Sequence, residues 1–547
     1  MTLNRNNEKE FFLGFILKER LMKKLVIGWL LRIIALPLFI LWIYSAITED
    51  LLFSIKAFFL PVIGALMVGN VLISKSNFVT QRGQIRDIDA FAAVAIAWPI
   101  VIFFGSLPFW FGGTFYGPSE FSFNIESLDD LFHGLLYSIF ESVSGFTTTG
   151  ATVIDSNTSP ICSRLVEDCI ASQPGSILLW RSLTQWLGGM GVIMLGILLI
   201  SNILGNSSAF ARAELTGPTM SMMGTNLQST ARRLWIIYFT LTILEIVALK
   251  FIGHLPLFDS VNYALTTLPT GGFGVSDGGV MDIKSNVVRL ILATFMILAG
   301  VNFSLYYIFA QGKFSDIVND EELRMYFSIL ILSTLTIALN VLIFEKGGFF
   351  EGLRELLTFH GLETIDQAFF QATSIGTSTG FASTDFSAWP VYSHLVLILL
   401  MVVGACAGST GGGIKVLRVK ISLELIKIEI QKYMSPRKVF AIRINDDVIQ
   451  ENRVWLVLGM ISSWFVLATF SVLILSLVHP DWTIETVVSV VFSSLGNTGP
   501  ALGQYGPTQT WSGIGDFSMI WTMMLMWIGR LEILTVLVLI HPKTWIG

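Results

Sequence analysis

Charged residues are scarce in this 547-residue sequence. Asp, Glu, Lys and Arg together make up 13% of the chain, whereas soluble domains carry about 25%. Hydrophobic residues make up 53%, Phe alone occurs 42 times, and the mean hydropathy is +0.69. The composition therefore excludes an ordinary soluble domain and predicts an all-α protein that crosses a membrane many times.

Catalytic and cofactor motifs are missing as well. The six histidines form no HExxH or other metal-ligand spacing, and no Gly-x-Ser-x-Gly elbow occurs. No GxGxxG fingerprint follows a strand-like segment, so the chain has no dinucleotide motif of its own. These absences argue against an intramembrane enzyme, and we expect neither a cofactor in this chain nor a nucleic-acid partner.

Cysteine occurs only three times. Cys162 and Cys169 fall in the expected external loop 152–175, where an oxidising compartment permits a disulfide. Two free thiols are the alternative. Cys406 is expected at membrane depth, where it has no partner for such a bond.

Ten apolar windows each reach about 20 residues, enough to span a bilayer. An even number of crossings places both ends of the chain on one side. Four shorter apolar pieces are too brief to cross and are expected to be half-membrane helices. The windows lie at 25–47, 51–73, 88–112, 176–203, 232–253, 286–311, 324–345, 391–433 (interrupted), 453–478 and 516–541, and the short pieces at 130–144, 258–268, 364–376 and 484–495.

Lysine and arginine gather in alternate connections between these windows. They cluster before the first window, at 75–86, around Arg212, and most densely at 415–453, which holds nine. Because such residues concentrate on the cytoplasmic side, both termini are predicted to be cytoplasmic. The first window contains Arg32 and is too long for a signal peptide, so we expect a retained span. Met22 is an alternative translation start.

A polar segment follows each of the four short apolar pieces. The segments are GFTTTGATVID (145–155), TLPTGGFGVSD (267–277), GTSTGFASTD (376–385) and LGNTGPALGQ (495–504), anchored on Gly150, Gly272, Gly380 and Gly499. In the first three an aspartate follows five residues later (Asp155, Asp277 and Asp385), and the fourth has Gln504. The chain thus predicts four tandem units of span, pore half-helix, filter strand and span, plus two extra N-terminal spans.

These polar strands predict an ion-selectivity filter. Irregular backbone at membrane depth is tolerated only inside protein or along a water-filled path, and glycine permits the positive φ values that aim carbonyl groups inward. Four strands around one axis can replace the water shell of a cation. Helix packing by small residues is the alternative, but four segments in phase favour the filter. Its predicted lining is Thr148, Thr149, Gly150, Thr270, Gly271, Gly272, Ser378, Thr379, Gly380, Asn497, Thr498 and Gly499.

These segments make the chain resemble the Trk/Ktr/HKT superfamily of potassium transporters, and specifically its TrkH-type subunits. Further matching stretches are RSLTQWLGGMG at 181–191, GACAGSTGGGIKVLR at 404–418, WIGRLE at 527–532 and the HP-containing tail at 541–542. The two extra spans before the first unit are similar to the TrkH type and differ from the shorter Ktr type. The match covers nearly everything after residue 22.

The resemblance implies potassium as the transported ion. Within the superfamily, a serine in place of the first filter glycine accompanies sodium permeation, and Gly150 is present here. It also implies the bacterial inner membrane, a homodimer among membrane lipids, and a cytosolic ring of nucleotide-binding subunits of the TrkA type. Channel-like conduction and proton symport both stay open. Asn497 and Pro500 set the fourth strand apart, so we expect an asymmetric, less strict filter.

A glycine-rich segment interrupts the window at 391–433. Its ten residues include five glycines, which cannot hold a helix. The resemblance places this loop beneath the filter, where we predict a gate; a flexible kink without function is the alternative. The predicted gate comprises Gly404, Ala405, Cys406, Ala407, Gly408, Ser409, Thr410, Gly411, Gly412 and Gly413.

Arg530 is expected to belong to this gate. A cation within an apolar window is costly and marks a functional site by default. Facing the cavity, it would oppose a permeating cation and hold the carbonyl groups of the loop, whereas an ion pair with Glu532 is the alternative. Arg181 begins its window near the outer surface and is expected to snorkel.

The basic helix expected at 414–434 has two interpretations. It offers a docking face for a regulatory partner, or it reflects the cytoplasmic bias of cations alone. A secondary transporter of another solute, built around the broken helix near 404–413, is the rival function. Equal parity of the four units argues against it, because such units run parallel and not inverted.

The predicted organisation divides the chain into six parts. A cytoplasmic N-terminal extension (1–24) precedes a two-helix membrane domain (25–80). Four pore units follow at 81–228, 229–318, 319–435 and 436–547, the third with the interrupted second span.

Overall fold

The computed structural model describes residues 2–75, 87–118, 125–162, 168–191, 227–435, 440–445 and 447–540. Nearly all regular structure in these ranges is helical. The only strands among them are β1 (Arg443–Ile444) and β2 (Asp447–Val448), which pair antiparallel. The predicted all-α class is confirmed. The tail motif at 541–542, residues 436–438 of the basic stretch and the expected boundary at residue 80 lie outside the described residues.

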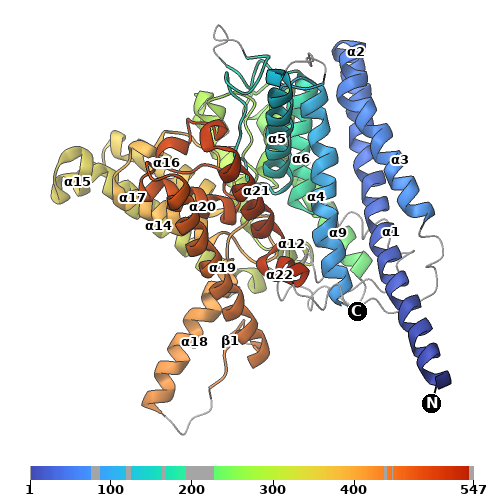
Figure 1. Ribbon diagram of the computed structural model, residues 1–547. Helices are drawn as coiled ribbons and strands as arrows, with labels where there is room; N and C mark the ends of the chain where they lie inside the picture. The colour runs from blue at the N-terminus through green and yellow to red at the C-terminus, as the bar shows by residue number, and fades with distance from the viewer. Residues whose placement is uncertain are drawn as a thin grey trace.

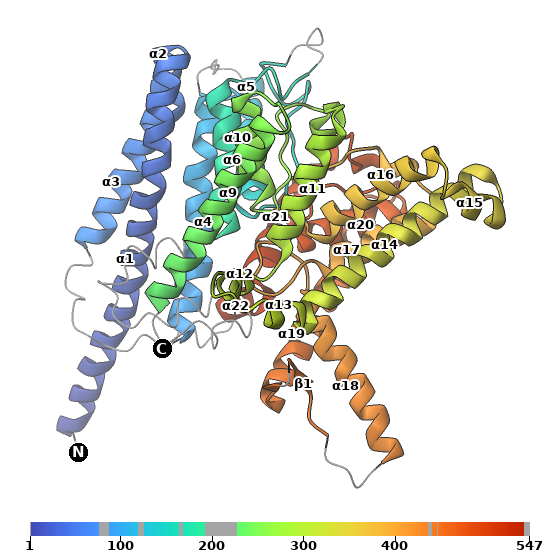
Figure 2. The same cartoon turned by 180° about the vertical axis from the view of Figure 1, so that it is seen from behind.

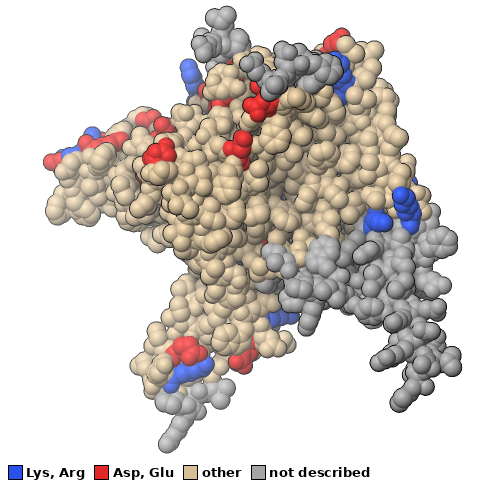
Figure 3. Space-filling model, in the orientation of Figure 1, with Lys and Arg blue, Asp and Glu red and all other residues tan. Residues whose placement is uncertain are grey.

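Six helical segments in the described ranges are long and apolar enough to cross a membrane, and each coincides with a predicted window. On the face drawn in Figure 3, a broad uncharged surface lies between charged upper and lower edges. A band of this kind is what the hydrocarbon core of a bilayer requires. The segments are Lys24–Thr48, Leu51–Ser74, Ala92–Phe111, Ala231–Phe251, Glu321–Lys346 and Glu451–Val478.

The first two spans form a hairpin beside the rest of the molecule (Figures 1 and 2). Helix α1 (Thr2–Thr48) packs along α3 (Leu60–Ser74), with α2 (Leu51–Ser54) and the π-helical η1 (Ile55–Phe59) between them. The carboxylate of Asp50 caps α2 by accepting from the backbone N–H groups of Leu52 and Phe53. Helix α1 then contacts α4 (Asp87–Phe111), which attaches the hairpin to the first pore unit.

All four short apolar pieces are helices that end at a polar strand. They are α5 (Ile125–Phe146), α10 (Leu257–Thr267), α16 (Phe359–Gly376) and α20 (Ile484–Gly496). Helix α5 is longer than expected, with 22 residues. Spans that begin the later units are α9 (Leu227–Phe251), α14 (Glu321–Lys346) and α19 (Glu451–Val478).

The second spans of the units break more often than the sequence predicted. One interruption was expected, between α17 (Val391–Val403) and α18 (Val416–Met434), and it is present. However, the window at 286–311 bends by 93° between α11 (Asn286–Gly300) and α12 (Phe303–Ala310). The window at 516–541 is likewise divided at Glu532, between α21 (Asp516–Leu531) and α22 (Ile533–Ile540). Helix α6 (Gly175–Gly189) ends early, and residues 192–203 of its window lie outside the described part.

Local chemistry explains the unexpected breaks. The side chain of Asn302 accepts from the N–H of Ser304 and so starts α12, while the N–H of Phe303 donates to the carbonyl of Gly408 in the glycine-rich loop. At the other break, Glu532 adopts a positive φ of 62°. A right-handed helix requires negative φ, so α21 ends here. Helix propensity alone does not reveal contacts of this kind.

The remaining elements connect the spans. Helices α13 (Phe314–Val318) and α15 (Phe349–Glu355) flank α14. Short 3₁₀ turns follow the polar strands: η4 (Gly279–Asp282), η5 (Phe386–Ala388), η6 (Gly503–Tyr505) and η7 (Ser512–Ile514). Helix α18 projects from the molecule at the end where α1 begins and α22 lies (Figure 1).

Candidate functional site

The four polar strands share one backbone conformation. In each, a residue without a glycine's freedom has a positive φ, and the anchoring glycine two positions later has one too. The pairs are Thr148 (54°) and Gly150 (88°), Thr270 (57°) and Gly272 (78°), Ser378 (61°) and Gly380 (85°), and Asn497 (52°) and Gly499 (99°). Because positive φ is uncommon outside glycine, its recurrence at one offset marks the four strands as the same structural device.

These strands meet around one axis in chain order. A β-carbon added to Gly150 would overlap the carbonyl oxygen of Gly271, and one added to Gly272 would overlap that of Thr379. In the same way, a β-carbon on Gly380 would overlap the carbonyl oxygen of Thr498, and one on Gly499 would overlap that of Thr149. The four contacts together close a ring. Only glycine fits at these four positions, because backbone approaches backbone there.

Side chains within the ring turn toward the helix ends. The hydroxyl of Thr149 lies 2.8 Å from that of Thr147, and the hydroxyl of Thr379 lies 2.8 Å from that of Thr377. The Asn497 amide donates to the hydroxyl of Thr149 at 3.1 Å, joining the fourth strand to the first. Backbone carbonyl groups are therefore the oxygens that neighbouring strands bring together.

Polar residues on surrounding helices brace the strands. Gln185 of α6 donates to the carbonyl of Gly271 at 2.7 Å and accepts from the N–H of Phe273 at 3.2 Å. Glu141 of α5 accepts from the N–H of Val153, and Gln371 of α16 accepts from that of Ser383, each at 3.2 Å. Each of these strands is thus tied to a helix by a buried side chain, which fixes the direction of its carbonyl groups.

The sequence reading missed these bracing residues. Glu141 and Gln371 each stand nine positions before the glycine of their strand, at Gly150 and Gly380. That shared offset is a signal by which the sequence alone could have identified them.

Arg181 corrects a sequence prediction. Its side chain was expected to snorkel toward water, but it is 2% exposed and forms a 2.6 Å ion pair with Glu141, which is fully buried. It also donates to the carbonyl of Gly274 at 2.8 Å and lies over the ring of Phe273. The carboxylate of Glu141, 40 positions earlier in the chain, compensates the buried charge of Arg181 in place of water.

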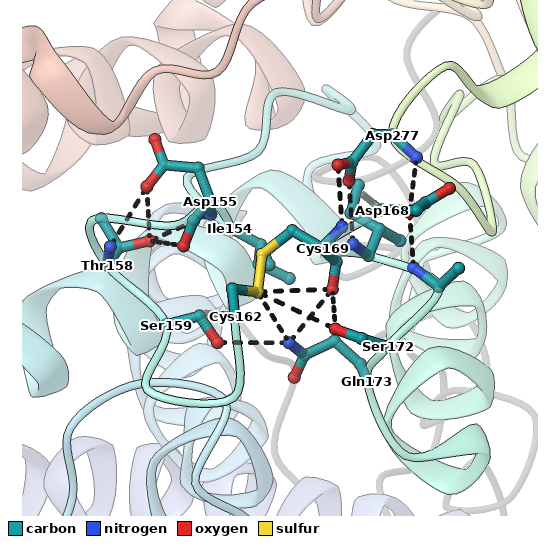
Figure 4. The surroundings of a disulfide bond; sticks show 12 residues. Ile154, Asp155, Thr158, Ser159, Cys162, Asp168, Cys169, Ser172, Gln173 and Asp277 are labelled. Carbon is teal, nitrogen blue, oxygen red and sulfur yellow. Dashed lines mark hydrogen bonds between the residues drawn. A yellow bond between two sulfur atoms is a disulfide. The ribbon is translucent and has the colours of Figure 1, made fainter. Parts of the chain in front are cut away.

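The three recurrent aspartates tie loops to the outer ends of the strands. Asp277 accepts from the N–H groups of Cys169 and Ile170, both at 2.8 Å (Figure 4). Asp155 accepts from backbone N–H groups of its own turn, and Asp385 caps η5. Their shared position therefore serves loop anchoring.

Two of the three cysteines are bonded to each other in this structure. Cys162 and Cys169 form a disulfide within the loop that Asp277 holds (Figure 4). Burial, reinforced by the charges of Asp277 and Asp282, raises the pKa of Asp168 at the base of this loop. Cys406 is free and buried.

The glycine-rich loop 404–413 lies directly against the inner side of the ring. The N–H of Gly412 donates to the hydroxyl of Ser378 at 2.6 Å. The hydroxyl of Thr410 donates to the carbonyl of Leu268 at 2.9 Å, at the end of α10. A β-carbon on Gly412 would overlap the carbonyl of Gly496. The loop thus contacts the inner ends of the second, third and fourth strands.

Arg530 joins the loop to the ring. One guanidinium nitrogen donates to the hydroxyl of Thr148 at 3.0 Å and to the carbonyl of Thr410 at 2.8 Å. The other donates to the carbonyls of Gly188 and Gly189, at 2.8 and 2.6 Å. The alternative partner, Glu532, forms its ion pair with Arg418 instead.

Two hollows lie on either side of this arrangement. All four anchoring glycines line the outer one, together with Asp277 and Arg181. The inner one is lined by Gly408, Ser409 and Gly411–Gly413 of the loop, and by Lys415 and Arg530. The ring therefore lies between the hollows, and the loop and Arg530 both line the inner hollow and contact the ring.

A family model described as a cation transport protein, TrkH, matches residues 54–545. The chain belongs to the TrkH family. This family consists of transport proteins, so the intramembrane enzyme is excluded, and the chain is a multi-pass membrane protein.

Similarity to named TrkH proteins supports this family assignment. The chain is 29% identical over 502 residues to the Trk system potassium uptake protein TrkH of Escherichia coli, covering 90% of this chain and 92% of that protein. It is 30% identical over 472 residues to the TrkH of Vibrio parahaemolyticus, covering 85% and 87%. The crystal structure of the potassium transporter TrkH from Vibrio parahaemolyticus matches with a TM-score of 0.76 at 26% identity, covering 96% of this chain and 99% of that one.

Proposed function

We propose that this chain takes up potassium through the ring of four strands. The ring is the single observation that carries the proposal, because backbone oxygens from four strands around one axis can replace the water shell of a dehydrated monovalent cation. The names of the relatives support potassium as the ion, and Gly150 fits that assignment. The twelve predicted lining residues, Thr148–Gly150, Thr270–Gly272, Ser378–Gly380 and Asn497–Gly499, would form the filter.

The loop 404–413 and Arg530 would form the gate. Support comes from their contacts with the inner side of the ring and from their place in the lining of the inner hollow. A polar loop with many backbone states can withdraw at small cost. We also propose the six-part division of the chain, in which four pore units follow an N-terminal extension and a two-helix domain.

The cellular setting is part of the same proposal. We place the chain in the bacterial inner membrane with both termini in the cytoplasm. The start of α1, helix α18 and helix α22 lie toward the same end of the molecule (Figure 1), which supports this placement. It would act as a homodimer with a cytosolic nucleotide-binding ring of the TrkA type, docked on the projecting helix α18. Channel-like conduction and proton symport are the two modes to be separated.

Rubidium flux into liposomes that hold only this chain tests the proposal. We expect rubidium uptake that potassium competes away, and an imposed proton gradient separates symport from passive conduction. Uptake that needs an organic solute would instead support a secondary transporter built on the broken helix. Absence of rubidium uptake from folded protein contradicts the proposal.

A further inference from the structure

We infer that the ion pair between Arg418 and Glu532 holds the segment that carries Arg530 against the start of helix α18, so that breaking the pair, by displacement of α18 or by substitution, releases Arg530. The inference rests on the proposed function, since it takes the loop 404–413 as the gate. Arg418 and Glu532 are assigned as positioning residues, because neither contacts the ring.

The pair lies where two breaks meet. Arg418 is in the first turn of α18, five residues after the loop ends at Gly413. Glu532 is the residue that separates α21 from α22, and it follows Arg530 by two positions. One guanidinium nitrogen of Arg418 reaches both carboxylate oxygens, at 2.7 and 2.6 Å. The contact therefore joins the far end of the loop to the segment that carries Arg530.

Burial makes this contact strong for an ion pair near a surface. The side chains are only 12% and 13% exposed, so water screens their attraction less than at an open surface. Lys427 and Glu424 on the same helix offer a contrast, since their side chains are 62% and 31% exposed. Of these two pairs, only Arg418–Glu532 joins α18 to a distant part of the chain.

Two neighbouring contacts keep the start of α18 in register. Lys420 forms a 2.7 Å ion pair with Glu321 at the beginning of α14. The next residue, Glu322, accepts from the N–H of Ala407 in the loop at 2.5 Å. Helix α14 thus contacts both α18 and the loop, and α18 also packs against α19. The Arg418–Glu532 pair adds a link from α18 to the segment that carries Arg530.

Release of Arg530 follows from the geometry. Helix α18 projects away from the molecule as a lever (Figures 1 and 2), and the positive φ of Glu532 marks a backbone joint. Displacing α18 breaks the pair with Glu532 and frees the end of α21 to turn. The guanidinium of Arg530 then leaves the Thr148 hydroxyl and the Thr410 carbonyl together.

Charge exchange tests the coupling by rubidium flux into liposomes holding the full chain. Glu532→Gln keeps the shape of the side chain and removes its charge, and we expect basal flux to rise about tenfold. Arg418→Glu is expected to do the same. The double exchange, Arg418→Glu with Glu532→Arg, is expected to return flux to within about twofold of the original. Potassium-over-sodium preference is expected to stay unchanged throughout, because the pair does not touch the ring.

Lys427→Gln is the matched control, with an exposed pair on the same helix, and should leave flux unchanged. A Glu532→Gln protein that elutes as the wild type but keeps wild-type flux overturns the inference. So does a double exchange no closer to wild type than the singles. If a variant shortened in the gate loop conducts while Glu532→Gln does not, the inference alone fails. If no variant conducts, the proposed function fails and this inference with it.

Discussion

The outer and inner sides of the ring of strands are held by different kinds of contact. Outside, a disulfide, the carboxylate of Asp277 and the buried pair of Arg181 and Glu141 converge on the strand exits. Inside, a loop with five glycines is held mainly through single backbone and hydroxyl hydrogen bonds. Removing one outer partner leaves a buried group uncompensated, whereas an inner contact is lost at the cost of one hydrogen bond.

The two arginines that contact the strands show the same contrast. Arg181 binds a carboxylate and the carbonyl of a strand exit, all within fixed elements. Arg530 binds the loop itself through the carbonyl of Thr410. A site that must select ions benefits from fixed oxygens, and a site that must open benefits from a contact that can be exchanged. If the proposed function is correct, selection and opening fall to separate faces of one ring.

The largest effect is expected from breaking the outer arginine pair. Arg181→Gln strands the charge of Glu141, which costs about 3 to 5 kcal/mol in stability. Thermal unfolding in detergent measures this loss. Arg289→Gln is the control, because its pair with Asp366 is 3.5 Å long and partly exposed, and such pairs contribute about 0 to 1 kcal/mol. Equal losses of stability in the two variants would show that the buried Arg181–Glu141 pair contributes no more than an exposed pair.

A smaller effect is expected in the ring. Gly150→Ser places a side chain at a φ of 88° and against the carbonyl of Gly271, a strain of about 1 to 3 kcal/mol. We expect the preference for potassium over sodium to fall at least about fivefold, measured by competition between the two ions in rubidium uptake. Gly459→Ser, where a β-carbon meets open space, is the control. Unchanged relative uptake would count against the filter.

Shortening the gate loop acts on the inner half. Removing Gly411–Gly413 deletes the N–H of Gly412 that contacts Ser378, a contact of about 1 to 1.5 kcal/mol. Basal flux without any regulator is expected to rise about tenfold. Flux that stays the same or falls, in protein that elutes as folded, would show that the loop is not the gate.

The smallest effect is expected at the base of the disulfide loop. Because the pKa of Asp168 is raised in the fold, the stability this group contributes is present below its ordinary pKa and is lost as the pH rises through the folded value. Asp168→Asn, which imitates the protonated form, is expected to stabilise slightly at pH 7, by less than about 1 kcal/mol because solvent screens the group. Unfolding temperatures at pH 5 and 8 measure it.

The advantage of Asp168→Asn is expected to narrow as the pH falls. Asp130→Asn, at an exposed position, is the control and should show no such trend. A wider gap at low pH would contradict the assigned sign.

The strands could be predicted from the sequence, whereas the inner breaks could not. Gly150, Gly272, Gly380 and Gly499 recur after apolar pieces of half-membrane length, and only a repeated local requirement produces that pattern. The bend after Gly300 has no proline and no run of glycines. Asn302 caps α12 locally, but the bend is also stabilised by a contact with the distant loop, which helix propensity does not record.

Burial of Arg181 was missed for a related reason. Its position near the start of an apolar window fits snorkelling when the window is considered alone. The deciding residue, Glu141, belongs to another helix. A pattern within one segment cannot show a charge that the fold brings from elsewhere, so paired buried charges are best sought between segments.

Closure of the ring between its first and fourth strands has a consequence for biosynthesis. Thr149 meets Gly499 and Asn497, almost 350 positions later in the chain. A ribosome must therefore finish nearly the whole polypeptide before the pathway exists, and a prematurely terminated chain leaves three strands with an open side.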